Sequence, residues 1–300
     1  MRKIIKIKFQ NLWGGEGIDD WKYTFFPFLN EYYDFVLSDN PDFIIFSNTY
    51  SKGMPDIKCN AQRVFFMGEN MDVDMSKCEW AFGFNFINHP QYFRMPYYVN
   101  RLLYTGTPFQ NLIKNNKKIS TKQKFCNFLF SNTNDGKTRN DFFEKLSEYK
   151  RVDSAGVSLN NMGYVLPGRA HIKDGYRRIY PDKTAFLNQY KFTIAYENDR
   201  NKRAKESIGA TTEKIVEPML VNSIPIYRGN PRIGEEFNPK SFINWHDYAN
   251  DNDMIDRIIK VDNDDKLYHD MLKEPWLHDN KLSQYLDINI ITEQFRRIFD

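Results

Sequence analysis

The chain has 300 residues, of which 41% are hydrophobic and 16% aromatic, enough for about two domains of ~100–200 residues each. This composition supports a substantial core and excludes a disordered protein. Lys and Arg number 42 against 39 Asp and Glu, so the net charge of +3 argues against a nucleic-acid or polyanion partner. Three widely spaced cysteines make neither a disulfide framework nor a zinc site, and they fit buried thiols in a reducing compartment: Cys59, Cys78 and Cys126.

The first residues alternate basic and apolar side chains, so we expect a strand over Ile4–Phe9. A signal peptide would need an apolar run of ~7–15 residues at this place. The sequence also lacks the ~18 uncharged apolar residues that a membrane span requires. We therefore expect a soluble, cytoplasmic protein with no transmembrane segment, for which peripheral membrane contact stays open.

Short apolar runs then alternate with segments of helical period, a pattern typical of βα units around a parallel sheet covered on both faces. A helix is expected over Trp21–Asn30, interrupted by Pro27. Three buried strands are expected at Phe43–Phe46, Val64–Met67 and Ala81–Phe86. A polar, basic stretch from Thr105 to Lys124 indicates an interdomain linker.

The βα pattern restarts after this stretch. Strands are expected at Phe125–Phe130, Phe192–Tyr196 and Ile224–Tyr227, and helices at Thr138–Tyr149, Thr184–Tyr190, from about Thr212, at Asp251–Lys260 and at Ile290–Phe299. Pro218 predicts a short or kinked helix after Thr212, because an interior proline costs ~3 kcal/mol. The resulting division is an N-terminal domain (1–113), a linker (114–124), a C-terminal domain (125–285) and a C-terminal helix (286–300) that can pack back on the first domain.

The loop Ser131–Lys137 follows a strand and opens a helix. Ser131 stands where a P-loop needs glycine, so a P-loop is not expected. Free backbone N–H groups at such a helix start still suit a phosphate. Arg139 lies in the first helical turn, where a cation opposes the helix dipole, a cost usually tolerated beside an anion. The alternative is an exposed arginine on a helix surface.

Glu69 follows the strand Val64–Met67 and a glycine, where open parallel sheets place residues that contact ligands. Its carboxylate could act as a general base. The alternative is a turn glutamate paired with a lysine.

Metal-binding patterns are weak. Three D-x-D matches (Asp72–Asp74, Asp251–Asp253 and Asp262–Asp264) are unremarkable in a chain with 27% charged residues, and the five histidines form no i, i+4 pair. We therefore expect no bound metal.

The densest set of polar residues runs from Phe192 to Tyr227. A strand ends in Glu197 and Asn198, a basic loop follows, and Thr212 is a plausible N-cap for a helix that begins with Glu213 and Lys214. Carboxylate, amide and ammonium groups at strand ends suit a nucleotide sugar, because lysine offsets phosphate charge and a carboxylate could stabilise oxocarbenium-like charge.

Several segments together resemble one family, the inverting bacterial α-1,3/4-fucosyltransferases. They occur in the family's order along the chain: Leu12–Gly15, Arg63–Asn70, Phe93–Tyr97, Tyr196–Asn198, Thr212–Ile215, Ile224–Tyr227 and Phe237–Asp247. The resemblance implies an α/β fold of GT-B type, with two Rossmann-like βα domains facing across a cleft. The N-terminal domain (1–113) would bind the acceptor and the C-terminal domain (125–285) would bind GDP-fucose. It also implies transfer of L-fucose from GDP-β-L-fucose, with inversion, to the 3-hydroxyl of GlcNAc or glucose in an N-acetyllactosamine-type oligosaccharide, giving a Lewis-antigen-like product.

The resemblance assigns roles residue by residue. Glu69 would be the general base, Glu213 would lie beside the fucose as a second catalytic residue, and Trp13 would join Glu69 on the acceptor side. The residues matching the GDP-fucose site are Arg139, Glu197, Asn198, Glu213 and Lys214. No tightly bound cofactor is implied; Mn²⁺ or Mg²⁺ could stimulate without being held by the protein, and a monomer is expected.

Two departures keep alternatives open. Ala210 stands where the family has an aromatic residue, and the loop from Asn198 to Thr212 is long and basic. A non-catalytic glycan- or nucleotide-binding protein on the same scaffold, or a GT-B transferase with another nucleotide sugar, would also fit these departures. The chain retains four charged residues that match the family's site, which argues against a binding protein because unused buried charges cost stability. These residues are Glu69, Arg139, Glu213 and Lys214.

Overall fold

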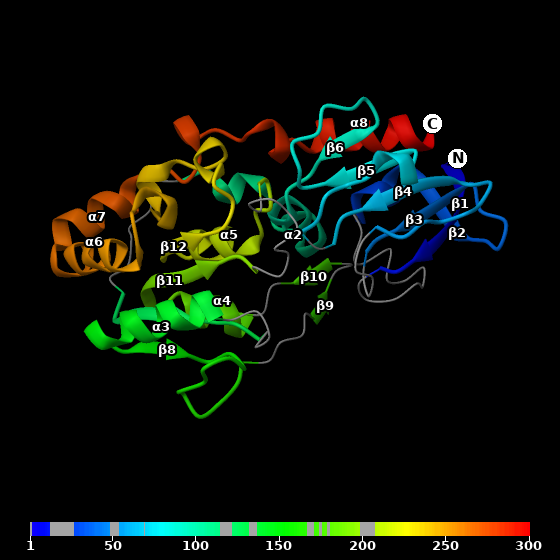
Figure 1. The fold of residues 1–300 in the computed structure, drawn as a ribbon. Helices are drawn as coiled ribbons and strands as arrows, with labels where there is room; N and C mark the ends of the chain where they lie inside the picture. Colours follow the sequence, from blue (N-terminus) through cyan, green and yellow to red (C-terminus); the bar gives the residue numbers. More distant parts are fainter. Residues whose placement is uncertain are drawn as a thin grey trace.

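The computed structural model describes residues 2–12, 27–48, 54–68, 70–114, 122–131, 137–166, 171–173, 176–178, 181–198 and 208–300. Two parallel sheets lie side by side within these residues (Figure 1). The first sheet has the order β2-β1-β3-β4-β5-β6, with strands β1 (Lys3–Gln10), β2 (Tyr33–Leu37), β3 (Phe43–Phe46), β4 (Gln62–Phe66), β5 (Trp80–Gly83) and β6 (Tyr92–Arg94).

The second sheet has the order β13-β12-β11-β7-β8. A separate antiparallel pair consists of β9 and β10, and β10 lies against helix α2 (Tyr97–Thr105). The strands are β7 (Lys124–Phe128), β8 (Val152–Ser154), β9 (His171–Lys173), β10 (Tyr176–Arg178), β11 (Tyr190–Tyr196), β12 (Ile224–Arg228) and β13 (Ile243–Asn244). The α-helices are α2 (Tyr97–Thr105), α3 (Lys137–Tyr149), α4 (Pro181–Leu187), α5 (Glu213–Leu220), α6 (Asp251–Asn263), α7 (Asp265–Lys273) and α8 (Ile288–Phe299).

Burial along the strands follows their sequences. All four residues of β3 are buried, as expected for a central parallel strand. In β1 burial alternates, because Ile5, Ile7 and Phe9 point inward while Lys6 and Lys8 stay exposed. The prediction that both faces of the sheet are covered is therefore wrong at β1.

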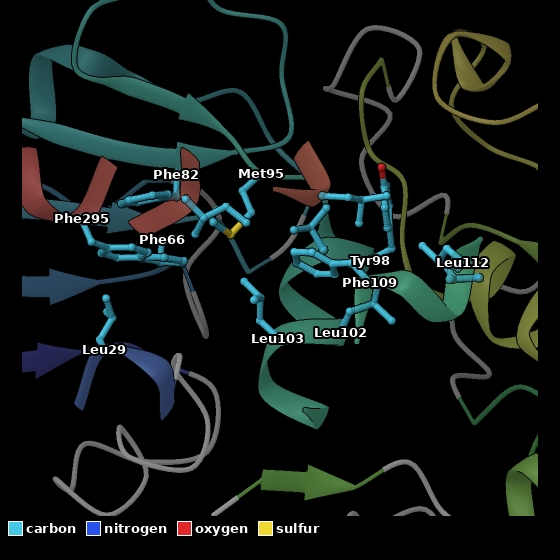
Figure 2. Packing of buried hydrophobic residues seen from close by; sticks show 14 of the residues in the cluster. Leu29, Phe66, Phe82, Met95, Tyr98, Leu102, Leu103, Phe109, Leu112 and Phe295 are labelled. Atoms are coloured by element: carbon cyan, nitrogen blue, oxygen red, sulfur yellow. The ribbon is translucent and has the colours of Figure 1, made fainter. Parts of the chain in front are cut away.

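One apolar core continues from the first sheet into the second domain. Figure 2 shows Phe66, Phe82 and Phe295 at one end of this cluster and Tyr98 and neighbouring α2 side chains at the other. The same cluster includes three buried residues of α5: Ile215, Val216 and Met219. Helix α2 thus packs between the first sheet and α5.

Helix α8 returns from the second domain to the first sheet, and the two ends of the chain lie side by side (Figure 1). The Phe295 ring stacks on Phe82 at 4.7 Å between centroids and on Phe66 at 6.2 Å. Lys3 Nζ donates hydrogen bonds to the carbonyl oxygens of Phe299 and Asp300 at 2.5 and 3.0 Å. The first sheet's core therefore contains residues from both ends of the sequence.

Most predicted elements match within a few residues. Thr212 caps α5, with its Oγ1 accepting from the Lys214 N–H, as predicted. α5 is only eight residues long, so Pro218 lies in a short helix as expected. The face of α3 formed by Phe142, Phe143 and Leu146 is buried.

Other predictions are wrong. Residues 27–31 form a 3-10 helix that begins at Pro27, a position that suits proline, so the predicted α-helix does not extend over residues 27–30. Residues 21–26 lie outside the described part, so the rest of that helix stays a prediction. The stretch from Thr105 is not a linker throughout, because Phe109 and Leu112 are buried in the core. Cys59 is exposed, whereas Cys78 and Cys126 are buried.

Among the described helices and strands, the sequence patterns missed α2, α7, β2, β6, β8, β9, β10 and β13. Among the described residues, no helix is long and apolar enough to cross a membrane.

Candidate functional site

Arg139 and Asn198 meet where two neighbouring strands end. Arg139 lies in the first turn of α3, which follows β7, and Asn198 comes two residues after β11. The Arg139 guanidinium donates to Asn198 Oδ1 at 3.0 Å, and it lies 4.5 Å from the centre of the Phe130 ring. Arg139 is only 2% exposed, so the alternative of an exposed surface arginine is wrong.

Glu197 organises the start of α5. Its Oε1 accepts from the Thr212 N–H at 2.7 Å, its Oε2 accepts from Thr212 Oγ1 at 2.6 Å, and Lys214 Nζ lies 3.5 Å from Oε2. Burial raises the pKa of Glu197 above its usual value. Both carboxylate oxygens are engaged within the protein, so Glu197 holds the helix start that carries Glu213 and Lys214.

Glu213 and Lys214 begin α5 as a partly exposed pair. Lys214 Nζ lies 3.8 Å from Glu213 Oε1, and their side chains are 19% and 21% exposed. Burial works to raise the pKa of Glu213, but the charges of Lys214, Lys183 and Arg101 outweigh it and hold the pKa below its usual value. Burial works to lower the pKa of Lys214, but Glu213 and Glu197 outweigh that effect and raise it. Both groups are therefore charged at neutral pH.

Three charged residues beside this pair were not predicted: Arg101 on α2, Glu217 on α5 and Lys183 on α4. Arg101 Nε and Nη2 both donate to Glu217 Oε1, at 3.2 and 3.0 Å, and Lys183 pairs with Glu217 Oε2. Arg101 and Glu217 are separated by 116 positions, so no local sequence pattern could have linked them.

Glu69 and Trp13 lie outside the described residues, so their placement stays a prediction. Glu69 follows β4 between the described residues Gly68 and Asn70, and the Gly68 N–H donates to Asn48 Oδ1 at 3.3 Å. The basic residues of the loop before α5 also lie outside the described part: Arg200, Lys202, Arg203 and Lys205.

Ala210 is buried in an apolar cluster that includes Phe84 and Tyr97. Gly209 beside it has φ +90°, and a Cβ there would lie 2.2 Å from the Phe84 carbonyl oxygen. The backbone entering α5 is therefore pressed against the first domain.

The D-x-D aspartates have structural partners. Asp74 caps a short 3-10 helix by accepting from the Ser76 N–H. Asp251 accepts from Trp245 and pairs with Lys145, and Asp262 pairs with Lys150 and Lys191. The described part of the chain contains no group of three or more His, Cys, Asp or Glu residues arranged to hold a metal ion.

Comparison with known proteins decides the family. Residues 119–293 match the model of the glycosyltransferase family 10 (fucosyltransferase) C-terminal domain. The chain belongs to this family. Residues 7–103 match the N-terminal domain of the α-(1,3)-fucosyltransferase FucT. The predicted resemblance is confirmed.

Curated relatives of this family 10 chain occur in bacteria and in animals. It is 30% identical over 306 residues to α-(1,3)-fucosyltransferase FucT of Helicobacter pylori, covering 90% of this chain and 60% of the relative. It is 32% identical over 171 residues to α-(1,3)-fucosyltransferase B of Drosophila melanogaster, covering 56% of this chain and 36% of the relative. The chain thus spans less than two thirds of the length of these relatives.

Solved structures confirm the fold class. A crystal structure of an α1,3-fucosyltransferase with GDP superposes with a TM-score of 0.77 at 28% identity, covering 99% of this chain and 91% of that one. The corresponding structure with GDP-fucose gives a TM-score of 0.78 at 27% identity, covering 100% and 91%. Together with the two parallel sheets, these similarities show the GT-B fold that the sequence predicted.

Proposed function

We propose that this family 10 chain is an inverting α-1,3-fucosyltransferase. It would move L-fucose from GDP-β-L-fucose to the 3-hydroxyl of GlcNAc or glucose in an N-acetyllactosamine-type oligosaccharide. The observation that carries the proposal is the convergence of Arg139 and Asn198 at the ends of β7 and β11, beside the Glu213–Lys214 pair at the start of α5. The similarity to structures solved with GDP and GDP-fucose supports the donor.

Arg139 and Lys214 would bind the donor diphosphate. A departing nucleoside diphosphate carries negative charge, which cations and helix N-termini stabilise in the transition state. The Asn198 contact and the Phe130 ring fix the Arg139 guanidinium, so it would need little reordering when the donor binds. Mn²⁺ or Mg²⁺ would stimulate the reaction without being held by protein carboxylates.

Glu213 would act beside the fucose. Its lowered pKa keeps it a carboxylate at neutral pH, and a negative charge next to the ring would stabilise the positive charge that develops as the glycosidic bond breaks. Inversion then needs one base on the opposite face of the sugar, by analogy with inverting hydrolysis. We assign that role to Glu69, with Trp13 on the acceptor side. A monomer and a cytoplasmic location stay predictions.

Release of GDP from GDP-fucose, with N-acetyllactosamine and lactose as acceptors, tests the proposal in the wild type and in Glu69→Ala. Turnover should fall by about 100-fold or more in the variant, the lower range for losing a general base. Glu144→Ala, at an exposed position of α3, is the matched control and should keep full turnover.

Each other result has a definite meaning. Unchanged turnover in Glu69→Ala would remove Glu69 from its role. Binding of GDP-fucose without turnover on either acceptor would contradict the proposed acceptor class. If GDP-fucose raises the melting temperature no more than other nucleotide sugars do, the donor assignment is wrong.

A further inference from the structure

The segment that leads into Glu213 and Lys214 contacts the first domain at several points. Arg94, the last residue of β6, donates from Nη2 to the Gly209 carbonyl at 3.2 Å and to Glu236 Oε1 at 2.7 Å. Four residues further along the chain, the Tyr98 N–H donates to the Thr211 carbonyl at 3.3 Å. These contacts hold the backbone immediately before Glu213.

Arg101 extends the docking into α5 itself. Its Nε and Nη2 converge on Glu217 Oε1, and its Nη1 donates to the Tyr104 hydroxyl at 2.7 Å. The Arg101 and Glu217 side chains are 16% and 4% exposed, so water screens the pair weakly. Glu217 lies four residues after Glu213, which places both on the same side of α5 one turn apart.

The apolar contact between α2 and α5 does not by itself fix their relative position. Val99 and Leu102 share a core cluster with Ile215 and Met219, but hydrophobic burial is non-directional. The planar guanidinium fork of Arg101, seated on one carboxylate oxygen, is directional. It therefore selects one register of α5 against α2.

We propose that Arg101 is a positioning residue that fixes α5, and with it Glu213 and Lys214, against the acceptor-side domain through Glu217. This inference rests on the proposed donor-binding role of Glu213 and Lys214. Transfer requires the donor, held by the second domain, and the acceptor, held by the first, to meet in one geometry. A small displacement of α5 would lower the rate more than it weakens donor binding, because reaction rates fall steeply with misplacement.

The test compares the full chain with Arg101→Gln, Arg101→Lys and Arg63→Gln. Arg63→Gln is the matched control, because Arg63 makes a similar two-bond pair with Glu79 at 2.6 and 3.1 Å but within the first sheet. Three quantities are measured: amide hydrogen exchange in α5, the affinity for GDP by calorimetry, and kcat and KM with GDP-fucose.

In Arg101→Gln we expect faster exchange in α5, a GDP affinity within about threefold of wild type, and a kcat lower by roughly tenfold to a hundredfold, the scale of a misplacement of about 1 Å. Arg101→Lys keeps the charge without the fork and should recover part of kcat. Arg63→Gln should leave α5 exchange and kcat unchanged.

A double-mutant cycle shows whether Arg101 acts through Glu217. In a Glu217→Gln background, adding Arg101→Gln should have little further effect on amide exchange in α5. The single variant Glu217→Gln and the double variant both lose the Lys183 ion pair, so that loss cancels in the comparison. Equal effects in both backgrounds would overturn the proposal, as would α5 exchange in Arg101→Gln that matches Arg63→Gln. A wild type without turnover on either acceptor would contradict the acceptor class of the proposed function, whereas the exchange measurements of the cycle would still decide whether Arg101 positions α5 through Glu217.

Discussion

At the scale of single residues, Arg139 is more than a charge near the donor. Its guanidinium is held by Asn198 and by the Phe130 ring, so its planar donors have a fixed direction. A lysine keeps the charge but presents a single ammonium on a flexible stem.

Arg139→Lys should therefore raise the KM for GDP-fucose. Loss of a hydrogen bond to a charged group costs about 1.5–3 kcal/mol, or roughly tenfold to a hundredfold in affinity. Steady-state kinetics and GDP calorimetry measure the change. Lys137→Met, which removes an exposed cation paired with Asp141 on the same helix, is the control and should leave KM unchanged.

The charges around Glu213 predict a shift in pH dependence. Lys214 on α5, Arg101 on α2 and Lys183 on α4 lower its pKa against the opposing effect of burial, and the carboxylate Glu197 also faces this site. Lys183→Met removes one of these cations, so the pKa of Glu213 should rise. The acid limb of kcat against pH should then move to higher pH, because Glu213 would take up its proton earlier as the pH falls.

A pH–rate series on Lys183→Met and on Lys266→Met measures this shift. Lys266 is exposed and pairs with Asp270 on α7. An acid limb at the same pH in wild type and Lys183→Met would show that Glu213 does not control it.

The sequence could predict the residues of the site that belong to contiguous motifs. Glu197 and Asn198 follow an apolar strand, and Glu213 and Lys214 follow a recognisable N-cap, so strand-end and capping rules were enough to predict their positions. Their roles toward the donor came from the resemblance and stay predictions. Glu217 lies in the same helix, but its sequence context is that of an ordinary surface glutamate. Its partner Arg101 lies 116 positions away and contacts it only in the folded structure.

At the scale of elements, the entry to α5 depends on Gly209. Its φ of +90° is accessible to glycine, and a Cβ would overlap the Phe84 carbonyl oxygen. The segment bearing Glu213 can approach the first domain this closely because no side chain intervenes.

Gly209→Ala should destabilise the protein more than Gly163→Ala. Gly163 also has a positive φ, +74°, but open space around it, so its substitution should cost only the conformational penalty of about 1–2 kcal/mol. At Gly209 the overlap should add about 1–3 kcal/mol. Urea unfolding of both variants measures the difference, and equal losses would contradict the close approach.

Helix α2 shows why some elements escape sequence prediction. Its sequence combines three tyrosines with a valine and a threonine, residues of modest helix propensity, and its stability comes from burial of seven of its nine residues. The helix begins directly after Pro96, a boundary that is clear once the structure is known. Helices α3 and α8 were predicted because their apolar side chains recur at helical spacing along one face.

At the scale of the whole molecule, the alternation of apolar runs and helical segments was sufficient to predict two βα domains. It could not predict how they dock, because Arg94–Glu236 and Arg101–Glu217 join residues 142 and 116 positions apart. No periodic pattern or motif in the sequence links the two residues of either pair.

Helix α8 should make a large contribution to the stability of the first sheet. Phe295→Ala removes a fully buried ring stacked on Phe66 and Phe82, and should cost about 3–5 kcal/mol. Ile290→Ala, on the exposed side of the same helix, should cost no more than about 0.5 kcal/mol. Chemical denaturation distinguishes them, and similar losses would mean that α8 contributes little to this core.

The return of α8 to the first sheet also sets an order for folding during synthesis. Chains usually fold domain by domain as they leave the ribosome, beginning with the N-terminal one. Here β1 emerges early, but Phe295 and Phe299, which pack in the core of its sheet, belong to residues 288–299. The second sheet is complete in the nascent chain before that helix has been translated. The first domain therefore reaches its final packing only after the strands of the second sheet have been made, and its apolar surface must remain protected until then.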